Sequence, residues 1–223
     1  MRLSRSIPFL FFVALAFAPS AESQTPGRTA SKTQADAKHP AATTEPAVFA
    51  GGCFWGIEAV FEHTKGVISA VSGYSGGTLK NPSYEDVTTE TTGHAESVRV
   101  TYDPSRVSYQ QLLEVFFAVH DPTQRNRQGP YVGPSYRSAI FYQNAVQKSA
   151  AGAYVAKLTA EKTFPRRIVT AIEPLKNFYE AEADHQHYLT NHPRQPYIVY
   201  NDLPKLAHLK STFPTLWREE PTD

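Results

Sequence analysis

The chain has 223 residues, of which 41% are hydrophobic and 19% are charged, so it can bury a sizeable core and is not disordered throughout. Its 22 basic and 21 acidic side chains balance, which argues against an electrostatic nucleic-acid binder, since such a protein normally has a strong basic excess. The single cysteine excludes an intrachain disulfide and a cysteine-based zinc site.

The first 46 residues are expected to precede the folded domain. Arg2 and Arg5 are followed by an apolar run over residues 7–18, a pattern typical of a secretory signal peptide over residues 1–23, with cleavage expected after Ser23. An uncleaved membrane anchor is the alternative, although the run is shorter than the roughly 20 apolar residues that cross a membrane. Residues 24–46 contain no aromatic residue and no Val, Ile or Leu, which predicts a flexible linker. A periplasmic or secreted location follows from the signal peptide.

The start of the domain carries the first candidate for chemistry. Residues 47–50 are apolar and end in Gly51-Gly52, which indicates a buried strand and a sharp turn. Cys53 follows at once, and apolar residues at helical spacing begin at Phe54. A cysteine at a helix N-terminus experiences the positive end of the helix dipole, which favours the thiolate and makes the sulfur nucleophilic. The alternative is an inert buried cysteine.

Two further strands are predicted, at residues 67–74 and 94–102. In the second, Glu96 shares one face with Val98 and Val100. A carboxyl group on an apolar face is partly desolvated, which raises its pKa and allows it to act as a general acid near neutral pH. A shifted register would instead place Glu96 in water, and the pattern leaves both interpretations open.

The rest of the chain predicts alternating helices and strands. Ser108 and Gln111 resemble a capping box at the start of a helix, and residues 120–136 predict a long functional loop. The remaining expected elements are a strand at 138–142, a helix at 144–161, a strand at 168–172 and a short helix at 178–189. Interleaved elements indicate the α/β (α+β) class with a single sheet. We expect the domain to span residues 47–205, followed by a C-terminal extension over residues 206–223.

A series of motifs in this order resembles the A-type peptide methionine sulfoxide reductases. Among them are Gly52-Cys53-Phe54-Trp55-Gly56, Gly73-Tyr74-Ser75-Gly76-Gly77, Asn81-Pro82-Ser83-Tyr84-Glu85, Thr92-Gly93-His94-Ala95-Glu96, Tyr136-Arg137-Ser138 and His185-Gln186. The resemblance spans roughly residues 47–200. It implies a two-layer sandwich with a mixed sheet, related to the ferredoxin-like arrangement.

The resemblance also implies a set of catalytic roles. Cys53 would attack the sulfoxide sulfur and Glu96 would protonate the departing oxygen. Tyr84 and Tyr136 would donate hydrogen bonds to that oxygen. The expected products are methionine and a sulfenic acid on Cys53.

The substrate site is implied in the same way. Phe54 and Trp55 would form an apolar wall for the S-methyl group, and Tyr131 and His185 would also contact the substrate. The family acts on the S epimer of methionine sulfoxide, free or in peptides and proteins. No metal or organic cofactor is implied, and we expect a monomer.

Two features depart from the family pattern. Many members carry further cysteines that resolve the sulfenic acid, whereas Cys53 is alone, so an external thiol must reduce the enzyme: a thioredoxin-like protein, a glutaredoxin-like protein or a small thiol. Tyr131 stands where many members have an aspartate, which predicts a changed water network and substrate preference.

Three other functions remain open on the sequence alone. A hydrolase or peroxidase would pair Cys53 with His94 or His185. A non-catalytic protein would bind methionine sulfoxide without turning it over. A metal-binding module would use three histidines near the end of the chain: His185, His187 and His192. One basic cluster is interpreted as a solvated surface: Lys162, Arg166 and Arg167.

Overall fold

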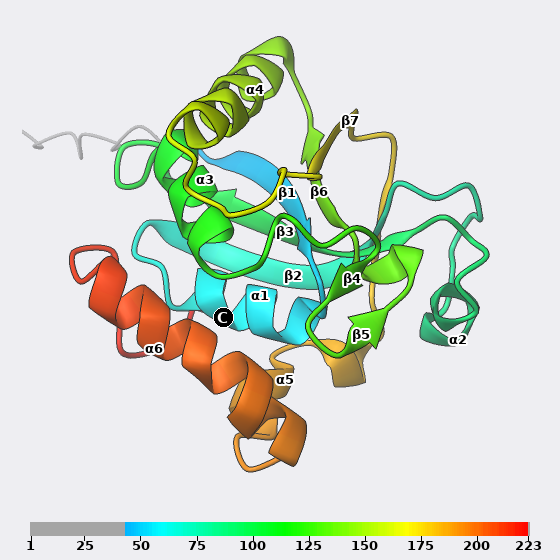
Figure 1. Ribbon diagram of the computed structural model, residues 1–223. Helices are drawn as coiled ribbons and strands as arrows, with labels where there is room; N and C mark the ends of the chain where they lie inside the picture. The colour runs from blue at the N-terminus through cyan, green and yellow to red at the C-terminus, as the bar shows by residue number, and fades with distance from the viewer. Residues whose placement is uncertain (1–42, 223) are drawn as a thin grey trace, which may run out of the picture. The chain divides into compact units, whose positions relative to one another are not determined.

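The computed structural model describes residues 43–222 (Figure 1), so the predicted signal peptide and most of the predicted linker lie outside the described residues. Within that range, no helix combines the length and the apolar character needed to cross a membrane. The first strand, β1 (Glu45–Gly51), begins two residues before the expected start of the domain, because Glu45 and Pro46 pair with Tyr102 and Thr101 of a neighbouring strand.

One layer of the fold is a six-stranded sheet with the order β7-β6-β1-β3-β2-β8. Its other strands are β2 (Val67–Ser75), β3 (Ala95–Tyr102), β6 (Ser138–Tyr142), β7 (Ala171–Pro174) and β8 (Phe178–Glu180). β6 and β7 are parallel and the other neighbours are antiparallel, so the sheet is mixed as expected. Two helices join its central strands: α1 (Phe54–Glu62) and α3 (Tyr109–Ala118). The resulting order β1-α1-β2-β3-α3-β6 has the connectivity of ferredoxin-like folds.

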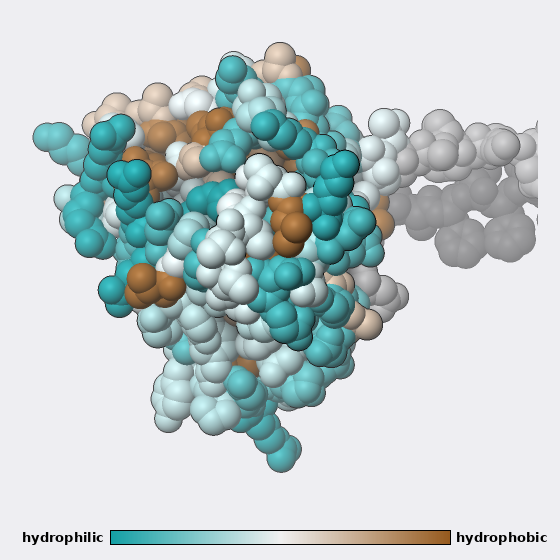
Figure 2. Space-filling view, turned by 90° about the vertical axis from the view of Figure 1, so that its right-hand side faces the viewer, coloured by the Kyte–Doolittle hydropathy of each residue, from teal (hydrophilic) through white to brown (hydrophobic). Residues whose placement is uncertain are grey.

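The helices form the second layer. α1, α3, α4 (Ala145–Ala160) and α6 (Leu203–Thr212) share one apolar core with the face of β1 that carries Phe49. The Phe49 ring centroid lies 5.2 Å from that of Phe61 and 5.0 Å from that of Phe116, which joins α1 and α3 to the sheet. The opposite face of β1 contributes Val48 and Ala50 to a smaller apolar cluster. The side of the molecule in Figure 2 is mostly hydrophilic, with hydrophobic residues in small separate groups.

Several helices begin at a polar residue whose side chain accepts a hydrogen bond from a backbone N–H of the first turn. Ser108 forms a capping box with Gln111 at the start of α3, as predicted, and Ser83 forms one with Asp86 at the start of α2 (Tyr84–Thr88). The Asn144 side chain accepts a hydrogen bond from the first turn of α4. Local chemistry therefore accounts for the boundaries of these helices.

The helix predicted at residues 178–189 is wrong. The segment forms β8, a 3-10 turn (Ala183–His185) and the short helix α5 (Tyr188–Asn191). Phe178 and Tyr179 pair with Ser75 and Tyr74 along the edge of β2. An available sheet edge, with which aromatic residues pack well, outweighs the local helical pattern.

Two other regions differ in detail. The loop predicted at 120–136 contains a hairpin of β4 (Arg127–Gln128) and β5 (Tyr131–Val132), then a 3-10 turn (Pro134–Tyr136). The strand predicted at 168–172 is found three residues later as β7, because the backbone N–H of Val169 instead donates a 2.8 Å hydrogen bond to the carbonyl of Pro122. Residues 206–212, expected in a C-terminal extension, lie in α6, which packs along α1 (Figure 1).

Candidate active site

Cys53 occupies the N-cap position of α1, directly after β1, so the predicted unit of strand, glycine turn, cysteine and helix is confirmed. Gly52 has a φ of +95°, and a side chain there would clash with that of Gln128. Glycine at this position therefore allows the β4–β5 hairpin to pack directly over the turn that presents the thiol.

The Cys53 thiol is only 7% exposed. Burial raises the pKa of this thiol well above its usual value, and the negative charges of Glu96 and Asp202 raise it further. The charge of Lys205 and a hydrogen bond with Tyr197 act in the opposite direction. Burial therefore favours the protonated thiol in the resting protein, in contrast to the thiolate expected from the position of Cys53 at the helix N-terminus.

Glu96 reaches the same place from β3. Its Oε2 atom accepts a hydrogen bond from the backbone N–H of Phe54 at 3.0 Å, and the residue is 2% exposed. Burial raises the pKa of Glu96 to about 8, although the Phe54 N–H opposes this shift. The interpretation that places Glu96 on a buried face is confirmed, and the solvated alternative is wrong. Near neutral pH the carboxyl group holds a proton that it can donate.

Four tyrosines surround the thiol and the acid. Tyr84 begins α2, Tyr136 ends the 3-10 turn, Tyr131 lies in β5 and Tyr197 precedes the π-helical turn Ile198–Asp202. The Tyr131 ring centroid is 4.8 Å from that of Tyr136 and 5.2 Å from that of Tyr197.

Two of these tyrosines stay protonated over a wide pH range. Burial raises the pKa of Tyr84 to about 12 and raises that of Tyr136 as well, and the charge of Glu96 adds to both shifts. Both phenols therefore remain O–H donors.

An aromatic group flanks the thiol. The Trp55 ring stacks on Tyr188 with centroids 3.7 Å apart, and its Nε1–H donates a hydrogen bond to Nδ1 of His185 at 3.2 Å. The His185 ring in turn lies 4.3 Å from Tyr84 and 5.5 Å from Phe54, between centroids. Phe54, Trp55 and His185 thus contact one another as a single aromatic group, and the role of Phe54 and Trp55 as a wall for the substrate stays a prediction.

The two histidines considered as bases for Cys53 have other partners. His185 Nδ1 accepts from Trp55, and His94 Nδ1 accepts from the backbone N–H of Gly77 at 3.2 Å while its Nε2 lies 2.8 Å from the carbonyl of Leu79. A thiol–imidazole pair of the hydrolase type is therefore not formed by either residue.

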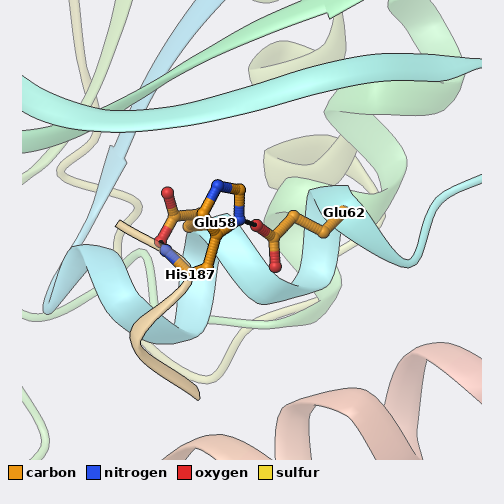
Figure 3. A group of neighbouring side chains, drawn as sticks. All are labelled: Glu58, Glu62 and His187. Carbon is orange, nitrogen blue, oxygen red and sulfur yellow. Dashed lines mark hydrogen bonds and ion pairs between the residues drawn. The ribbon is translucent and has the colours of Figure 1, made fainter. Parts of the chain in front are cut away.

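The buried carboxyl groups of Glu58 and Glu62 on α1 lie together with the partly exposed His187 (Figure 3). Glu58 accepts hydrogen bonds from the backbone N–H groups of Ser72 at 3.2 Å and His187 at 3.0 Å. His187 Nδ1 lies 2.5 Å from Oε1 of Glu62. This group braces α1 against β2 and the turn before α5. The metal-binding alternative grouped His185, His187 and His192, but each has a different partner. His187 contacts Glu62, His185 contacts Trp55, and His192 stacks on Tyr188.

Sequence reasoning missed Asp202 and Lys205. Lys205 Nζ lies 2.9 Å from Oδ1 of Asp202, which is fully buried, and Oδ2 has no hydrogen-bond partner among the described residues. A side chain at Gly56 would overlap both groups, so the pair lies directly against the first turn of α1. The one sequence signal was Gly56 inside a helix, which indicates a close approach of another segment. The π-helical turn that ends at Asp202 has no such signal, although these turns are frequent at functional sites.

Comparison with known proteins identifies the family of the chain. Residues 45–216 match the family model described as peptide methionine sulfoxide reductase. A relative from Mesorhizobium japonicum named peptide methionine sulfoxide reductase MsrA 2 is 57% identical over 179 residues, which cover 80% of this chain and 92% of the relative. The crystal structure of Mxr1 from Saccharomyces cerevisiae in reduced form is 32% identical, with a TM-score of 0.65 over 71% of this chain and 91% of that one. Methionine sulfoxide reductase A of Corynebacterium diphtheriae is 37% identical, with a TM-score of 0.62 over 68% and 76% of the two chains.

The fold and the family comparisons together define an oxidoreductase. The family match covers most of the chain, and the protein belongs to the peptide methionine sulfoxide reductase family.

Proposed function

We propose that the protein reduces the S epimer of methionine sulfoxide, free or in oxidised proteins, to methionine, with electrons from an external thiol. The observation that carries the proposal is the buried acid beside the thiol. Glu96 is held by the N–H of Phe54, the residue that follows Cys53, and its pKa of about 8 keeps a proton available.

The reaction starts from a protonated thiol and a protonated carboxyl group. Glu96 gives its proton to the sulfoxide oxygen while the Cys53 sulfur attacks the sulfoxide sulfur, and Tyr84 and Tyr136 donate hydrogen bonds to the same oxygen. The attack forms a bond between the two sulfurs. The protonated oxygen then leaves the substrate sulfur with its bonding electron pair and bonds to the Cys53 sulfur, while the sulfur–sulfur bond breaks and methionine leaves with the electron pair of that bond. Cys53 is left as a sulfenic acid. The thiol proton passes to Glu96, which restores the acid. One oxygen is transferred, and no proton is gained or lost overall.

Phe54 and Trp55 give this site its preference for the S-methyl group. The two residues directly follow Cys53 in the chain, and His185 accepts a hydrogen bond from the Trp55 indole at its Nδ1 atom. Tyr131 faces the site from the hairpin and packs on Tyr136. A small apolar group next to the reacting sulfur is stabilised by these aromatic surfaces.

Recycling requires two thiols from outside the chain, since Cys53 is the single cysteine of the sequence. The first thiol attacks the sulfenic sulfur and releases water, which leaves a mixed disulfide on Cys53. The second thiol attacks that disulfide, which restores the Cys53 thiol and releases an oxidised dithiol. A thioredoxin-like protein, a glutaredoxin-like protein or a small thiol meets this requirement, and the catalytic unit is a monomer.

The proposed setting is the periplasm or the outside of the cell. The pattern of residues 1–23 supports it, with a linker from residue 24 to the start of β1. Cell fractionation and N-terminal sequencing test this proposal. A mature protein that begins at Gln24 in the periplasm or the medium agrees with it, and a full-length cytoplasmic protein contradicts it.

A single-turnover experiment tests the chemistry. Reduced protein is mixed with excess methionine-S-sulfoxide without a reductant, and both the methionine formed and the mass of the protein are measured. About one methionine per protein with one oxygen added at Cys53 is expected. The Cys53→Ser variant is the control and forms none. A folded protein with a titratable thiol that forms no methionine would contradict the proposal and favour a non-catalytic binder.

A further inference from the structure

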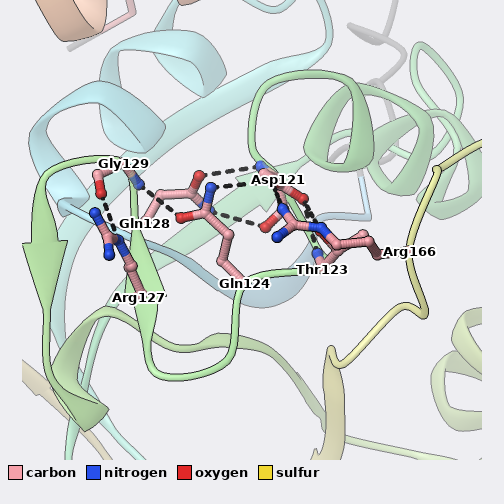
Figure 4. Close-up of polar contacts among 7 residues, drawn as sticks. All are labelled: Asp121, Thr123, Gln124, Arg127, Gln128, Gly129 and Arg166. Carbon is pink, nitrogen blue, oxygen red and sulfur yellow. Dashed lines mark hydrogen bonds and ion pairs between the residues drawn. The ribbon is translucent and has the colours of Figure 1, made fainter.

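The basic cluster that the sequence suggested was a solvated surface belongs to a larger group in the structure. The segment before β7 runs beside the loop that leads into β4 (Figure 1), fixed by the hydrogen bond from Val169 to Pro122 and by the ion pair between Arg166 and Asp121 at 3.1 Å (Figure 4). This contact places basic side chains from three parts of the chain together. We call them the basic face: Arg125, Arg127, Arg137, Lys162, Arg166 and Arg167.

The basic face is hollowed rather than flat. Arg125, Arg137 and Arg167 line a hollow of about 320 Å³. Arg125 and Arg166 line a second one of about 300 Å³, together with Arg127. Arg166 and Arg167 also line a third of about 200 Å³. Each pair of hollows shares an arginine, so the three lie next to one another on this face.

This surface is poorly neutralised. Among residues 43–222, Arg166 is the one member of the basic face that forms an ion pair, and its partner Asp121 also accepts hydrogen bonds from Thr123 and Gln124 (Figure 4). The charge of Glu173 acts on Arg137. Since basic and acidic residues are balanced over the whole sequence, 22 against 21, this gathering of cations is a local segregation of charge.

The basic face adjoins the active site. Arg127 precedes Gln128, whose side chain lies against Gly52, and it pairs with Val132, next to Tyr131. Arg137 directly follows Tyr136. An extended peptide advances about 3.3 Å per residue, so we infer that residues a few positions from a methionine held at Cys53 extend toward these arginines.

We propose that the basic face binds acidic side chains that flank methionine sulfoxide in polypeptide substrates, so that the protein preferentially repairs methionines in acidic segments. This inference rests on the proposed function and names a substrate class for it. Guanidinium groups hold carboxylates through two parallel hydrogen bonds, and a concave cationic surface also speeds the approach of an anionic chain.

The test compares three substrates: an acidic peptide and a basic peptide of equal length around one methionine-S-sulfoxide, and N-acetylmethionine sulfoxide. At low ionic strength we expect kcat/KM for the acidic peptide to exceed that for the basic peptide by about tenfold, the effect of roughly 1.4 kcal/mol, and the ratio to shrink with added salt. The double variant Arg125→Gln/Arg167→Gln is expected to bring the ratio near one without changing turnover of N-acetylmethionine sulfoxide. The matched control is Lys65→Gln/Arg106→Gln, at the other end of α1, which is expected to keep the ratio.

Several outcomes would overturn the inference. One is equal kcat/KM for the two peptides in the unmodified protein, and another is an unchanged ratio in the Arg125→Gln/Arg167→Gln variant. A third is an Arg125→Gln/Arg167→Gln variant that keeps the peptide ratio but turns over more slowly with a protein reductant. The basic face would then bind the electron donor and not the substrate. Failure to turn over N-acetylmethionine sulfoxide at all would instead reject the proposed function, which separates the two failures.

Discussion

The carboxylate of Glu96 and the backbone N–H of Phe54 lie 3.0 Å apart in a hydrogen bond that links β3 to the first residue of α1. Because Phe54 follows Cys53 in the chain, this bond fixes the acid relative to the nucleophile through one peptide unit. The acid cannot move away from the thiol without losing the hydrogen bond. Both groups therefore meet the substrate in one fixed arrangement, and this arrangement leads to the first prediction.

The single-turnover rate is expected to fall as the pH rises through about 8, because the carboxyl group of Glu96 loses the proton that it must donate. Glu96→Gln is expected to slow the reaction by about 10² to 10⁴ and to remove this pH dependence. Quenched single-turnover reactions between pH 6 and pH 10, in which the methionine formed is measured over time, give both the rate and its pH dependence. A rate for the unmodified protein that stays constant or rises across pH 8 would show that Glu96 is not the acid.

The pair of Asp202 and Lys205 is expected to control the pKa of the Cys53 thiol in opposite directions. Asp202→Asn removes a negative charge and lowers the pKa, whereas Lys205→Met removes a positive charge and raises it. The pH dependence of alkylation by a neutral reagent measures both. Damage to packing would shift the pKa of Cys53 in the same direction in both variants. Opposite pKa shifts therefore indicate an electrostatic effect.

Tyr131 is expected to tune the substrate site through its ring. Tyr131→Asp removes the contacts with Tyr136 and Tyr197 and adds a negative charge near Glu96. Tyr131→Phe retains the ring and is the matched control. An aromatic contact of about 1 kcal/mol corresponds to a several-fold change, so we expect kcat/KM of Tyr131→Asp to fall about tenfold below that of Tyr131→Phe. Unchanged affinity and turnover in Tyr131→Asp would show that this position does not tune the site.

Glu58 is expected to make the folded protein less stable as the pH rises. Burial, with a further contribution from Glu62, raises the pKa of Glu58 from 4.5 to about 8, so the folded state keeps a proton that the unfolded chain loses. The stabilising contribution is complete below pH 4.5 and is lost as the pH rises through about 8. Urea unfolding between pH 5 and 8 should give a smaller loss of stability for Glu58→Gln than for the unmodified protein.

A surface carboxylate provides the control for this measurement. Glu85 is exposed on α2, and Glu85→Gln is expected to leave the pH dependence of stability unchanged. If Glu58→Gln and Glu85→Gln behave alike, Glu58 is not the source of the effect.

Features that depend on neighbouring residues in the chain could be predicted from the sequence. The apolar run, the glycine turn and the helical spacing that begins at Phe54 specified the position of Cys53, and the side chain of Ser108 specified the start of α3. The alternation around Glu96 predicted a strand but left open whether the carboxyl group is buried or in water, and the register of β3 decided this point.

Features that depend on tertiary packing could not be predicted in this way. The expected thiolate at Cys53 followed from the local helix dipole, whereas the pKa is decided by burial and by Asp202, which lies about 150 positions away in the sequence. β8 exists because β2 offers an open edge, which no pattern within residues 178–189 reveals. The basic face likewise arises only when the segment that carries Arg166 meets Asp121.

The stacking of Trp55 on Tyr188 beside the nucleophile has an optical consequence. The sequence has two tryptophans, and the other, Trp217, stacks on His63 at the far end of α1 with ring centroids 4.8 Å apart. Replacing Trp217 with phenylalanine would therefore leave Trp55 as the single tryptophan, two residues from Cys53 in the chain, and it can be excited selectively over the tyrosines. Its emission would change as Cys53 passes from thiol to sulfenic acid to mixed disulfide, so each step of the cycle could be timed without a label.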